Sequence, residues 1–229
     1  MSKNHLKPQH APTTWTIQRK TVRYVTRPNA GAHSMDLSMP INLILKNLLK
    51  IAKTNKEVKK ILHEQEVLVD GTRRKDYRYP MGLMDVLSIP KIKESYVMLL
   101  NEQNKLFLQQ IYNKDSSTKI SKITGKKILK KGVVQLKTLD GRTLKVKKDT
   151  YKTGESIVIT IPGQEIKETL KLEKGTPILM FRGRYAGSMA TIVSIEGQTL
   201  KFMKDSKEFE TKKSYAIAIG KDKPLIKIQ

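Results

Sequence analysis

Hydrophobic side chains recur at helical spacing in two adjoining stretches of the chain. Residues 40–53, PINLILKNLLKIAK, place apolar side chains every three or four positions and predict an amphipathic helix that opens at a proline. Residues 54–65 predict a second helix, because Thr54 and Glu57 have the spacing of a capping box. In residues 67–79 the pattern becomes a strand, a tight Asp-Gly turn and a second strand. Two short helices followed by a hairpin predict a compact α/β module.

From Val97 onward, short apolar or alternating runs replace the helical period, and polar or glycine-containing turns separate them. Short strands at this spacing are typical of small β-barrels. The sequence therefore predicts an α+β protein that is mostly β. The segments predicted to contain strands are residues 98–111, 127–149, 155–163, 176–181, 189–195, 196–203, 215–220 and 224–228.

The first 39 residues show neither a helical nor a strand period. Prolines at 8, 12, 28 and 40 interrupt the pattern, and the charged residues are nearly all basic. We expect this segment to be an extended arm that is disordered alone and folds against a partner.

The charge of the chain indicates that this partner is a polyanion. Lys and Arg number 45 against 21 Asp and Glu, so the formal net charge is +24, spread over 229 residues. Nucleic acid is the favoured partner, because phosphate contacts release counterions. An acidic membrane is the competitor, but no segment forms the basic amphipathic helix with bulky apolar anchors that such binding requires. No signal-peptide core or membrane span is expected either.

Cysteine is absent, which excludes disulfides, a thiolate nucleophile and a zinc knuckle, and fits a reducing cytosol. The histidines at 5, 10, 33 and 63 have no metal-ligand spacing, so no metal site is expected; those in the arm are expected to bind phosphate or face water. Asp70 and Asp140 precede glycines and are assigned to turn geometry alone. No nucleophile elbow or carboxylate pair is visible. The sequence predicts neither an enzyme nor a bound cofactor.

The segment RGRYAGSMATI, residues 182–192, resembles a damaged phosphate-binding loop. A nucleotide site would need a Gly-Lys-Ser/Thr sequence and a following helix, whereas here a β-branched strand pattern follows. What remains is a basic glycine loop between two strands. Arg182, Arg184 and Tyr185 would project from it toward RNA phosphate, or form a plain solvated hairpin tip.

A stronger binding signal follows the turn at Asp70, where RRKDYR combines an aromatic ring with four cations. Guanidinium groups take phosphates bidentately, and a tyrosine can stack on an unpaired base. Lys53 and Lys56 flank the start of the second helix, where the helix dipole also favours an anion. Trp15, the single tryptophan, either anchors the arm on the folded part or stacks on RNA; the sequence leaves both open.

Several segments, in order, closely resemble the S4e family of small-subunit ribosomal proteins of archaea and eukaryotes. They are HLKPQHAPTTW, RPNAGAH, VLVDGTRRKDYRYP, MGLMDVLSI, LDGRTL and GKDKPLIKI. The resemblance extends over essentially the whole chain. The resemblance implies a basic extended arm over 1–39, an S4-type RNA-binding α/β module over 40–92 and a central β-domain over 93–170. A C-terminal SH3-like barrel with a KOW motif and a last strand would occupy 171–229.

The resemblance also implies a structural, non-catalytic role in translation, in the cytoplasmic ribosome. The partners would be ribosomal RNA of the small subunit and neighbouring small-subunit proteins, with no membrane and no small-molecule substrate. The chain stops soon after GKDKPLIKI, without the longer tail of eukaryotic members, which favours an archaeal source. The residues predicted to bind RNA are His5, Lys7, Trp15, Arg19, Lys20, Arg23, Arg27, Lys53, Lys56, Lys60, Arg73, Arg74, Lys75, Tyr77, Arg78, Arg142, Arg182, Arg184, Tyr185 and Gly187.

The chain departs from the family pattern in two places. The KOW pattern has a basic residue and a glycine where Ser188 and Ala190 stand, so this loop is expected to contact RNA less strongly than Arg73 and Arg74 do. In the arm, Ala32 stands where a Gly-Pro-His pattern has its proline, so the local backbone is expected to be less rigid.

Two other functions fit parts of the pattern. An RNA-modification factor could use the helix pair as its RNA handle, but would need a catalytic domain, and mapping of new modifications in ribosomal RNA would reveal it. A transcription elongation factor could carry a KOW barrel, and would co-purify with RNA polymerase rather than with small subunits.

Overall fold

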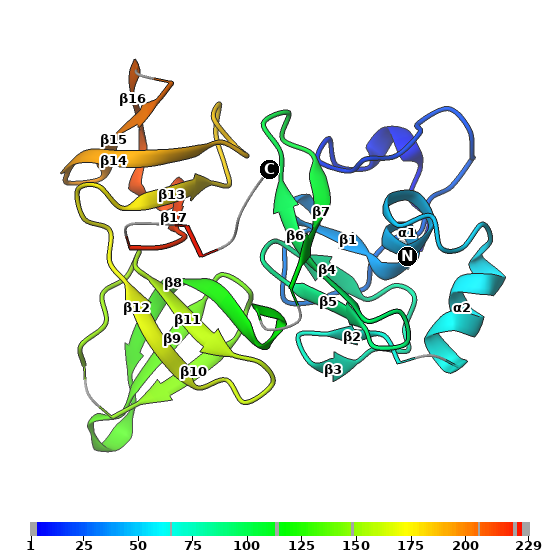
Figure 1. The fold of residues 1–229 in the computed structure, drawn as a ribbon, viewed down its shortest axis with the longest axis horizontal. Helices are drawn as coiled ribbons and strands as arrows, with labels where there is room; N and C mark the ends of the chain where they lie inside the picture. The colour runs from blue at the N-terminus through cyan, green and yellow to red at the C-terminus, as the bar shows by residue number, and fades with distance from the viewer. Residues whose placement is uncertain are drawn as a thin grey trace. The chain divides into compact units, whose positions relative to one another are not determined.

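The computed structural model describes residues 4–64, 66–112, 115–147, 149–205, 207–221 and 224–225 (Figure 1). The chain divides into two compact units. Unit 1 comprises Met1–Leu100 and Asn104–Ser117, and unit 2 comprises Asn101–Gln103 and Thr118–Gln229. Strands form most of the regular structure in both units, so the predicted α+β, mostly β class is confirmed.

Unit 1 is built on a five-stranded antiparallel sheet in the order β3-β2-β5-β6-β7. A separate antiparallel pair joins β1 to β4. Among the described residues the strands are β1 (Ser38–Pro40), β2 (Leu68–Val69), β3 (Thr72–Arg73), β4 (Pro80–Gly82), β5 (Val86–Ile89), β6 (Glu94–Leu100) and β7 (Leu106–Ile111). The helical elements are η1 (Pro8–His10), η2 (Met35–Leu37), α1 (Ile41–Leu43), η3 (Ile44–Leu48), α2 (Asn55–Glu64) and η4 (Asp115–Ser117).

The helix predicted over 40–53 is shorter than expected. One α-helical turn, α1, continues as a π-helical turn, η3, that ends at Leu48. Lys50 then adopts a φ of +54°, and the N–H groups of Ile51 and Ala52 both bond to the carbonyl of Leu45. This turn stops the helix although the apolar spacing continues.

Helix α2 begins where the capping box predicts. The Glu57 N–H donates to Thr54 Oγ1 at 3.2 Å, and Glu57 Oε2 accepts from the Lys53 N–H at 2.7 Å. These hydrogen bonds, first among them the one from the Lys53 backbone, lower the pKa of Glu57. Val58 and Leu62 form the buried face of the helix, so the predicted cap and apolar stripe are confirmed.

The described part of the arm packs on unit 1. Trp15 is 1% exposed, and its Nε1 donates to the Ser38 carbonyl at 2.7 Å. Thr14 Oγ1 donates to the Asp36 carbonyl at 2.7 Å, and Leu6 pairs with Val25 through an isolated bridge. Of the two roles left open for Trp15, the structure assigns it the anchor: the indole is buried, and its hydrogen bonds end inside the fold.

Unit 2 contains two five-stranded antiparallel sheets. The first has the order β10-β9-β8-β11-β12 and the second β16-β15-β14-β13-β17. The first group consists of β8 (Thr118–Ile128), β9 (Val134–Thr138), β10 (Thr143–Val146), β11 (Ser156–Thr160) and β12 (Ile166–Leu170), with a short helical turn η5 (Lys130–Gly132). The second consists of β13 (Pro177–Met180), β14 (Met189–Glu196), β15 (Thr199–Lys204), β16 (Lys207–Lys212) and β17 (Ala216–Ala218), with η6 (Lys213–Tyr215) before the last strand.

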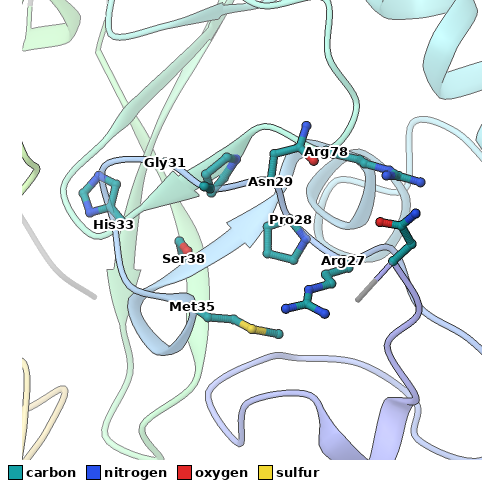
Figure 2. A pocket seen from close by; sticks show the side chains of 11 residues that line it. Arg27, Pro28, Asn29, Gly31, His33, Met35, Ser38 and Arg78 are labelled. Atoms are coloured by element: carbon teal, nitrogen blue, oxygen red, sulfur yellow. The ribbon is translucent and has the colours of Figure 1, made fainter. Parts of the chain in front are cut away.

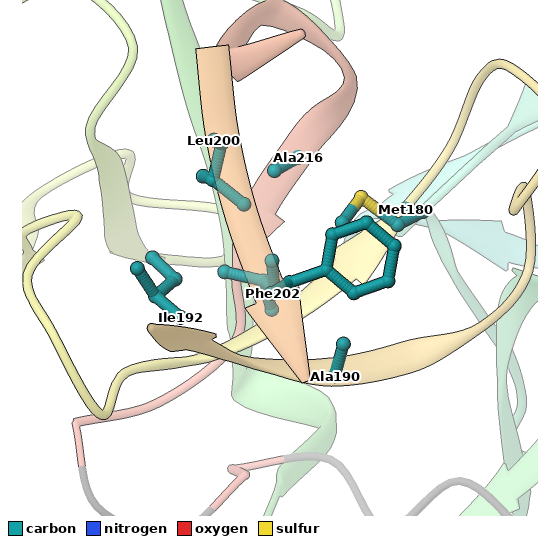
Figure 3. Packing of buried hydrophobic residues seen from close by; sticks show 7 residues of the cluster. Met180, Ala190, Ile192, Leu200, Phe202 and Ala216 are labelled. Atoms are coloured by element: carbon teal, nitrogen blue, oxygen red, sulfur yellow. The ribbon is translucent and has the colours of Figure 1, made fainter. Parts of the chain in front are cut away.

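Each sheet of unit 2 encloses its own apolar cluster. In the second sheet Ile178, Met180, Leu200 and Phe202 are buried together, and Figure 3 shows the Phe202 ring at the centre of this group. In the first sheet the cluster includes Ile123, Leu136, Ile157 and Ile159. Burial of these side chains is the main stabilising term for each sheet.

Three strands of unit 2 were not predicted in full. Strand β8 begins at Thr118, before the predicted segment at 127, and β12 and β16 were not predicted at all. Strand β16 has no buried residue and lies at the edge of its sheet, paired only with β15. The predicted last strand, at 224–228, lies mostly outside the described residues; in the described part, Pro224 bridges Gly220. No described helix is long and apolar enough to span a membrane.

Candidate nucleic-acid interface

The turn between β2 and β3 holds the basic segment that follows it. Asp70 and Gly71 have φ values of +51° and +70°, as the central residues of a type I′ hairpin turn do. Asp70 Oδ1 also accepts the Val86 N–H at 2.9 Å. The predicted Asp-Gly turn is therefore confirmed, and the aspartate ties it to β5 as well.

Helix α2, strand β3 and the residues beside them carry exposed cations. Arg73 Nη2 donates to the His63 carbonyl at 2.9 Å, which holds this arginine at the C-terminal end of α2. Lys60 forms only an exposed 3.8 Å pair with Glu64, which contributes little. Of the residues predicted to bind RNA, those exposed in this region are Lys53, Lys56, Lys60, Arg73 and Lys75. We call these five residues the α2–β3 basic cluster.

Tyr77 and Arg74 were also predicted to bind RNA, and both are half-buried in contacts with other side chains of unit 1. The Tyr77 ring is half-buried between cations: Lys59 Nζ lies 4.8 Å and Arg78 Cζ 5.4 Å from its centroid. Arg74 is half-buried, with Cζ 4.4 Å from the Tyr79 ring centroid. Tyr77 therefore positions cations instead of presenting a bare ring for base stacking. Lys59 was missed, although it stands three residues after Lys56 on the same helix face.

The arm contains both exposed cations and cations that hold its own backbone. Arg19 donates to the carbonyls of Pro8, Ala11 and Pro12 at 2.8–3.1 Å, so its guanidinium stabilises the arm. His5 lies against Tyr24, 4.8 Å between ring centroids, and Arg23 Cζ lies 5.4 Å from the same ring. Of the other predicted residues here, His5, Lys7, Lys20 and Arg23 are exposed and Arg27 is half-buried.

The β13–β14 loop exposes its arginines but not its other predicted contacts. Arg182 and Arg184 are exposed. Tyr185 packs edge-on against Phe202, 5.3 Å between centroids, and tilted against Phe209 at 4.9 Å. Tyr185 was predicted to be an exposed contact; it is half-buried, because its ring packs against the apolar cluster of the sheet.

Gly187 is buried in the same loop, with a φ of +85°. A Cβ atom at this position would lie 1.7 Å from the Asn101 carbonyl oxygen. The glycine therefore permits a close backbone approach within unit 2, which gives this position a structural reason to be glycine.

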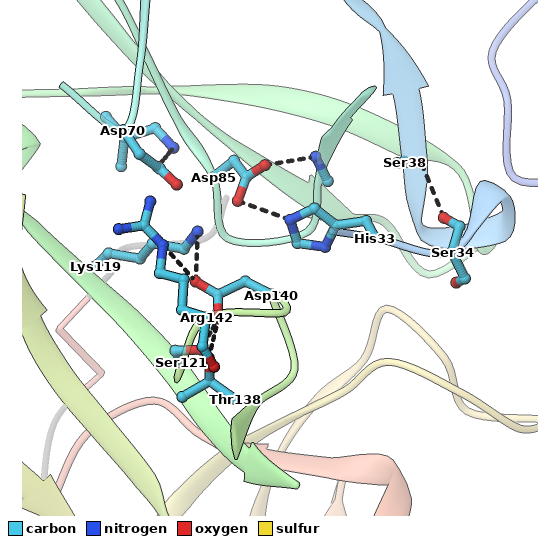
Figure 4. Close-up of polar contacts among 12 residues, drawn as sticks. His33, Ser34, Ser38, Asp70, Asp85, Lys119, Ser121, Thr138, Asp140 and Arg142 are labelled. Carbon is cyan, nitrogen blue, oxygen red and sulfur yellow. Dashed lines mark hydrogen bonds and ion pairs between the residues drawn. The ribbon is translucent and has the colours of Figure 1, made fainter. Parts of the chain in front are cut away.

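Asp140 does more than form a turn. Its Oδ2 lies 3.0 Å from Lys119 Nζ and 3.1 Å from Arg142 Nε, and its Oδ1 accepts from Ser121 Oγ at 2.9 Å. Thr138 Oγ1 donates to the same Oδ1. Figure 4 shows these side chains converging on the carboxylate. The assignment to turn geometry alone was incomplete, and Arg142, predicted to bind RNA, is half-buried and paired with Asp140.

The His33 side chain is buried and pairs with Asp85, so it is not exposed to water or to phosphate. Its Nε2 lies 3.0 Å from Asp85 Oδ1, and both side chains are at most 5% exposed (Figure 4). Asp85 Oδ2 accepts the Gly82 N–H at 2.8 Å. The expectation for the arm histidines is therefore wrong for His33. Among the described residues, no three acidic or histidine side chains gather in a way that could hold a metal ion.

Lys122 on β8 is a buried cation that the sequence pattern did not reveal. The side chain is buried, and Nζ donates to the carbonyls of Lys213, Ser214 and Ala216 at 3.1, 2.8 and 2.5 Å. Burial, with a smaller effect of the charge on Lys213, lowers the pKa of Lys122 from 10.5 to about 8. This lysine ties β8 to the segment that leads into β17 within unit 2.

Unit 2 is expected to gain stability as the pH rises from about 8 to 10.5, through Lys122. Below pH 8 both states carry the proton, and the folded state bears the full cost of burying the charge. Between the two pKa values only the unfolded state stays protonated, so raising the pH increases the free energy of unfolding, by on the order of 2 kcal/mol. Urea unfolding of wild type and Lys122→Met, at about pH 7.5 and about pH 10, measures this. Parallel pH profiles for the two proteins would contradict it.

Cations are exposed on α2, β3, the arm and the β13–β14 loop, which is the pattern of a protein that binds a polyanion. Among the described residues, no cluster of side chains could hold a metal ion. Comparison with known proteins gives the family. A model of ribosomal family S4e matches residues 92–166, and a model of the RS4NT domain matches residues 2–36. The chain belongs to the S4e family of small ribosomal subunit proteins.

Relatives match over nearly the full length. The small ribosomal subunit protein eS4 of Methanococcus aeolicus is 38% identical over 98% of this chain and 97% of its own. The eS4 protein of Methanocella arvoryzae is 38% identical over 99% of this chain and 98% of its own. The crystal structure of the 30S ribosomal protein S4e of Thermoplasma acidophilum has a TM-score of 0.71 and 28% identity, covering 81% of this chain and 96% of that one. The resemblance inferred from the sequence segments is confirmed.

Proposed function

We propose that this chain binds ribosomal RNA as a structural component of the small ribosomal subunit, and that it takes part in translation in the cytoplasm without catalysing a reaction. The observation that carries this proposal is the match to eS4 proteins over 98% of the chain at 38% identity. The charge supports it independently, since a net +24 favours a large polyanion as its partner.

We propose the finer division of the fold as well. An arm over 1–39 precedes an S4-type module over 40–92, a central β-domain over 93–170 and an SH3-like KOW barrel over 171–229. Helix α2 with the β2–β3 hairpin supports the S4-type assignment, and the sheet β16-β15-β14-β13-β17 supports the barrel. Strands β6 and β7 extend the sheet of unit 1 beyond residue 92, so the compact unit is larger than this module.

The α2–β3 basic cluster is the proposed centre of the RNA-binding surface. Lys56 and Lys60 stand on helix α2 and Arg73 on strand β3, and Arg73 is held by the His63 carbonyl. Long exposed side chains on a fixed backbone suit phosphate groups of a folded RNA, which is recognised mostly by shape. The exposed cations of the arm, and Arg182 and Arg184, would add further phosphate contacts. Neighbouring small-subunit proteins are further partners, whereas a membrane or a small-molecule substrate is not.

Sedimentation of a cell lysate through a sucrose gradient tests the proposal. The chain is expected in the fractions that contain small subunits, and to leave them at high salt, because phosphate contacts weaken steeply with ionic strength. Its appearance with RNA polymerase, or at the top of the gradient at low salt, would contradict the proposal.

A further inference from the structure

Unit 1 contains a pocket of about 470 Å³ between the arm and the segment that enters β4. Its volume falls in the range of small-molecule sites, about 300–1,000 Å³. The arm contributes Arg27, Pro28, Asn29 and Met35, the segment before β4 contributes Arg78, and β4 contributes Pro80. Figure 2 shows these polar and apolar side chains of the arm facing the same space.

Backbone and side-chain contacts hold the walls of this pocket in place. The Asn29 N–H donates to the Arg78 carbonyl at 3.0 Å, and Asn29 Nδ2 donates to Asp76 Oδ2 at 2.6 Å. Gly31 packs so closely on Pro80 that a Cβ atom there would overlap the proline ring. His33, paired with Asp85, forms part of the lining as well. A pocket held by such contacts is largely formed before its ligand arrives.

The lining residues include two arginines, two asparagines and two prolines, and no acidic residue. The guanidinium groups favour an anionic ligand such as phosphate. The proline rings and Met35 offer apolar surface to a flat ring, and asparagine amides can bond to the edge of a base. Phosphate alone would leave the apolar wall without a function, and a base-paired helix is too wide to enter.

We infer that this pocket binds one unpaired nucleotide that is turned out of the folded RNA. Its base lies against Pro28, Pro80 and Met35, and its phosphate lies near Arg27 and Arg78. Sequence-specific RNA recognition uses such splayed bases far more than paired ones. The inference rests on the proposed function, and it adds a base-binding site to a surface otherwise made of phosphate contacts.

Chemical probing of small-subunit ribosomal RNA, bound to the purified full-length protein, tests the inference. Acylation of 2′-hydroxyl groups reports the reactivity of each nucleotide. Two variants disable the pocket in different ways: Arg27→Gln removes a cation, and Ala30→Phe adds bulk at an exposed lining position without changing the charge. Lys167→Gln, at an exposed lysine outside the lining and outside the residues predicted to bind RNA, is the matched control for the loss of one positive charge.

One or two unpaired nucleotides protected by the wild type are expected to regain their reactivity with Arg27→Gln and Ala30→Phe, and to stay protected with Lys167→Gln. Affinity should fall about 10-fold for each pocket variant. A protection pattern unchanged in Ala30→Phe, for a variant with wild-type circular dichroism, overturns the inference and leaves the proposed function standing. If the wild type protects no nucleotide of this RNA, the proposed function itself is wrong.

Discussion

Replacing Gly187 with alanine is expected to lower the free energy of unfolding by about 4 kcal/mol. Two costs combine at this position. The φ of +85° lies in a region that L-residues rarely adopt, and the added Cβ would lie 1.7 Å from the Asn101 carbonyl oxygen. The added Cβ would overlap backbone atoms of Asn101 and Glu102, so no side-chain rotation relieves the overlap. Urea unfolding followed by circular dichroism measures the loss.

Gly175→Ala is the matched control, because Gly175 has the same φ of +85° but no atom within 4 Å of the added Cβ. Gly175→Ala should lower the free energy of unfolding by only about 1 kcal/mol, because it adds the cost of the left-handed backbone conformation without a steric overlap. Equal losses for the two variants would show that the approach of Asn101 to Gly187 does not matter for stability.

Replacing Lys56, Lys60 and Arg73 together by glutamine is expected to weaken binding to ribosomal RNA by on the order of 100-fold or more at low salt. All three side chains are exposed members of the α2–β3 basic cluster. If each contacts one phosphate, the slope of log affinity against log salt should become shallower by about 2–3. Filter binding between about 50 and 200 mM salt measures both quantities.

Glutamine at Lys167, Lys171 and Lys174 provides the control for total charge. These lysines are exposed on and after β12, outside the predicted RNA-binding residues, and their replacement changes the net charge by the same amount. A similar loss of affinity in both triple variants would mean that overall charge, and not the α2–β3 basic cluster, determines binding.

Features with a local signal were predictable from the sequence. The capping box of Thr54 and Glu57 and the turn at Asp70 and Gly71 depend on residues within a few positions of each other, and both are present. The exposed cations of the α2–β3 basic cluster follow directly from the helix period and the turn. The helix after Pro40 was predicted too long, because a positive φ at Lys50 depends on tertiary packing and not on hydrophobic spacing.

Features that depend on contacts distant in sequence were missed or misread. His33 and Asp85 are 52 residues apart, and Lys122 bonds to carbonyls more than 90 residues away. Lys119 and Lys122 interrupt the apolar pattern at the start of β8, which was not predicted, although both are buried against polar partners. Tyr185 and Gly187 occupy positions of the KOW motif in a loop, and the sequence does not show that both pack toward the interior of unit 2. Polar residues in a basic protein are the hardest to assign, since the same lysine can serve either the solvent face or the interior.

The buried amine of Lys122 has a consequence for covalent chemistry. An amine whose pKa is about 8 is substantially neutral, and hence nucleophilic, under mildly alkaline conditions where surface lysines remain almost fully protonated. Three carbonyls and the surrounding β-structure nevertheless keep reagents away from it. Acylation at this one residue, followed by mass spectrometry, would therefore record how often β8 separates from the segment before β17, and incorporation into the ribosome should slow that modification.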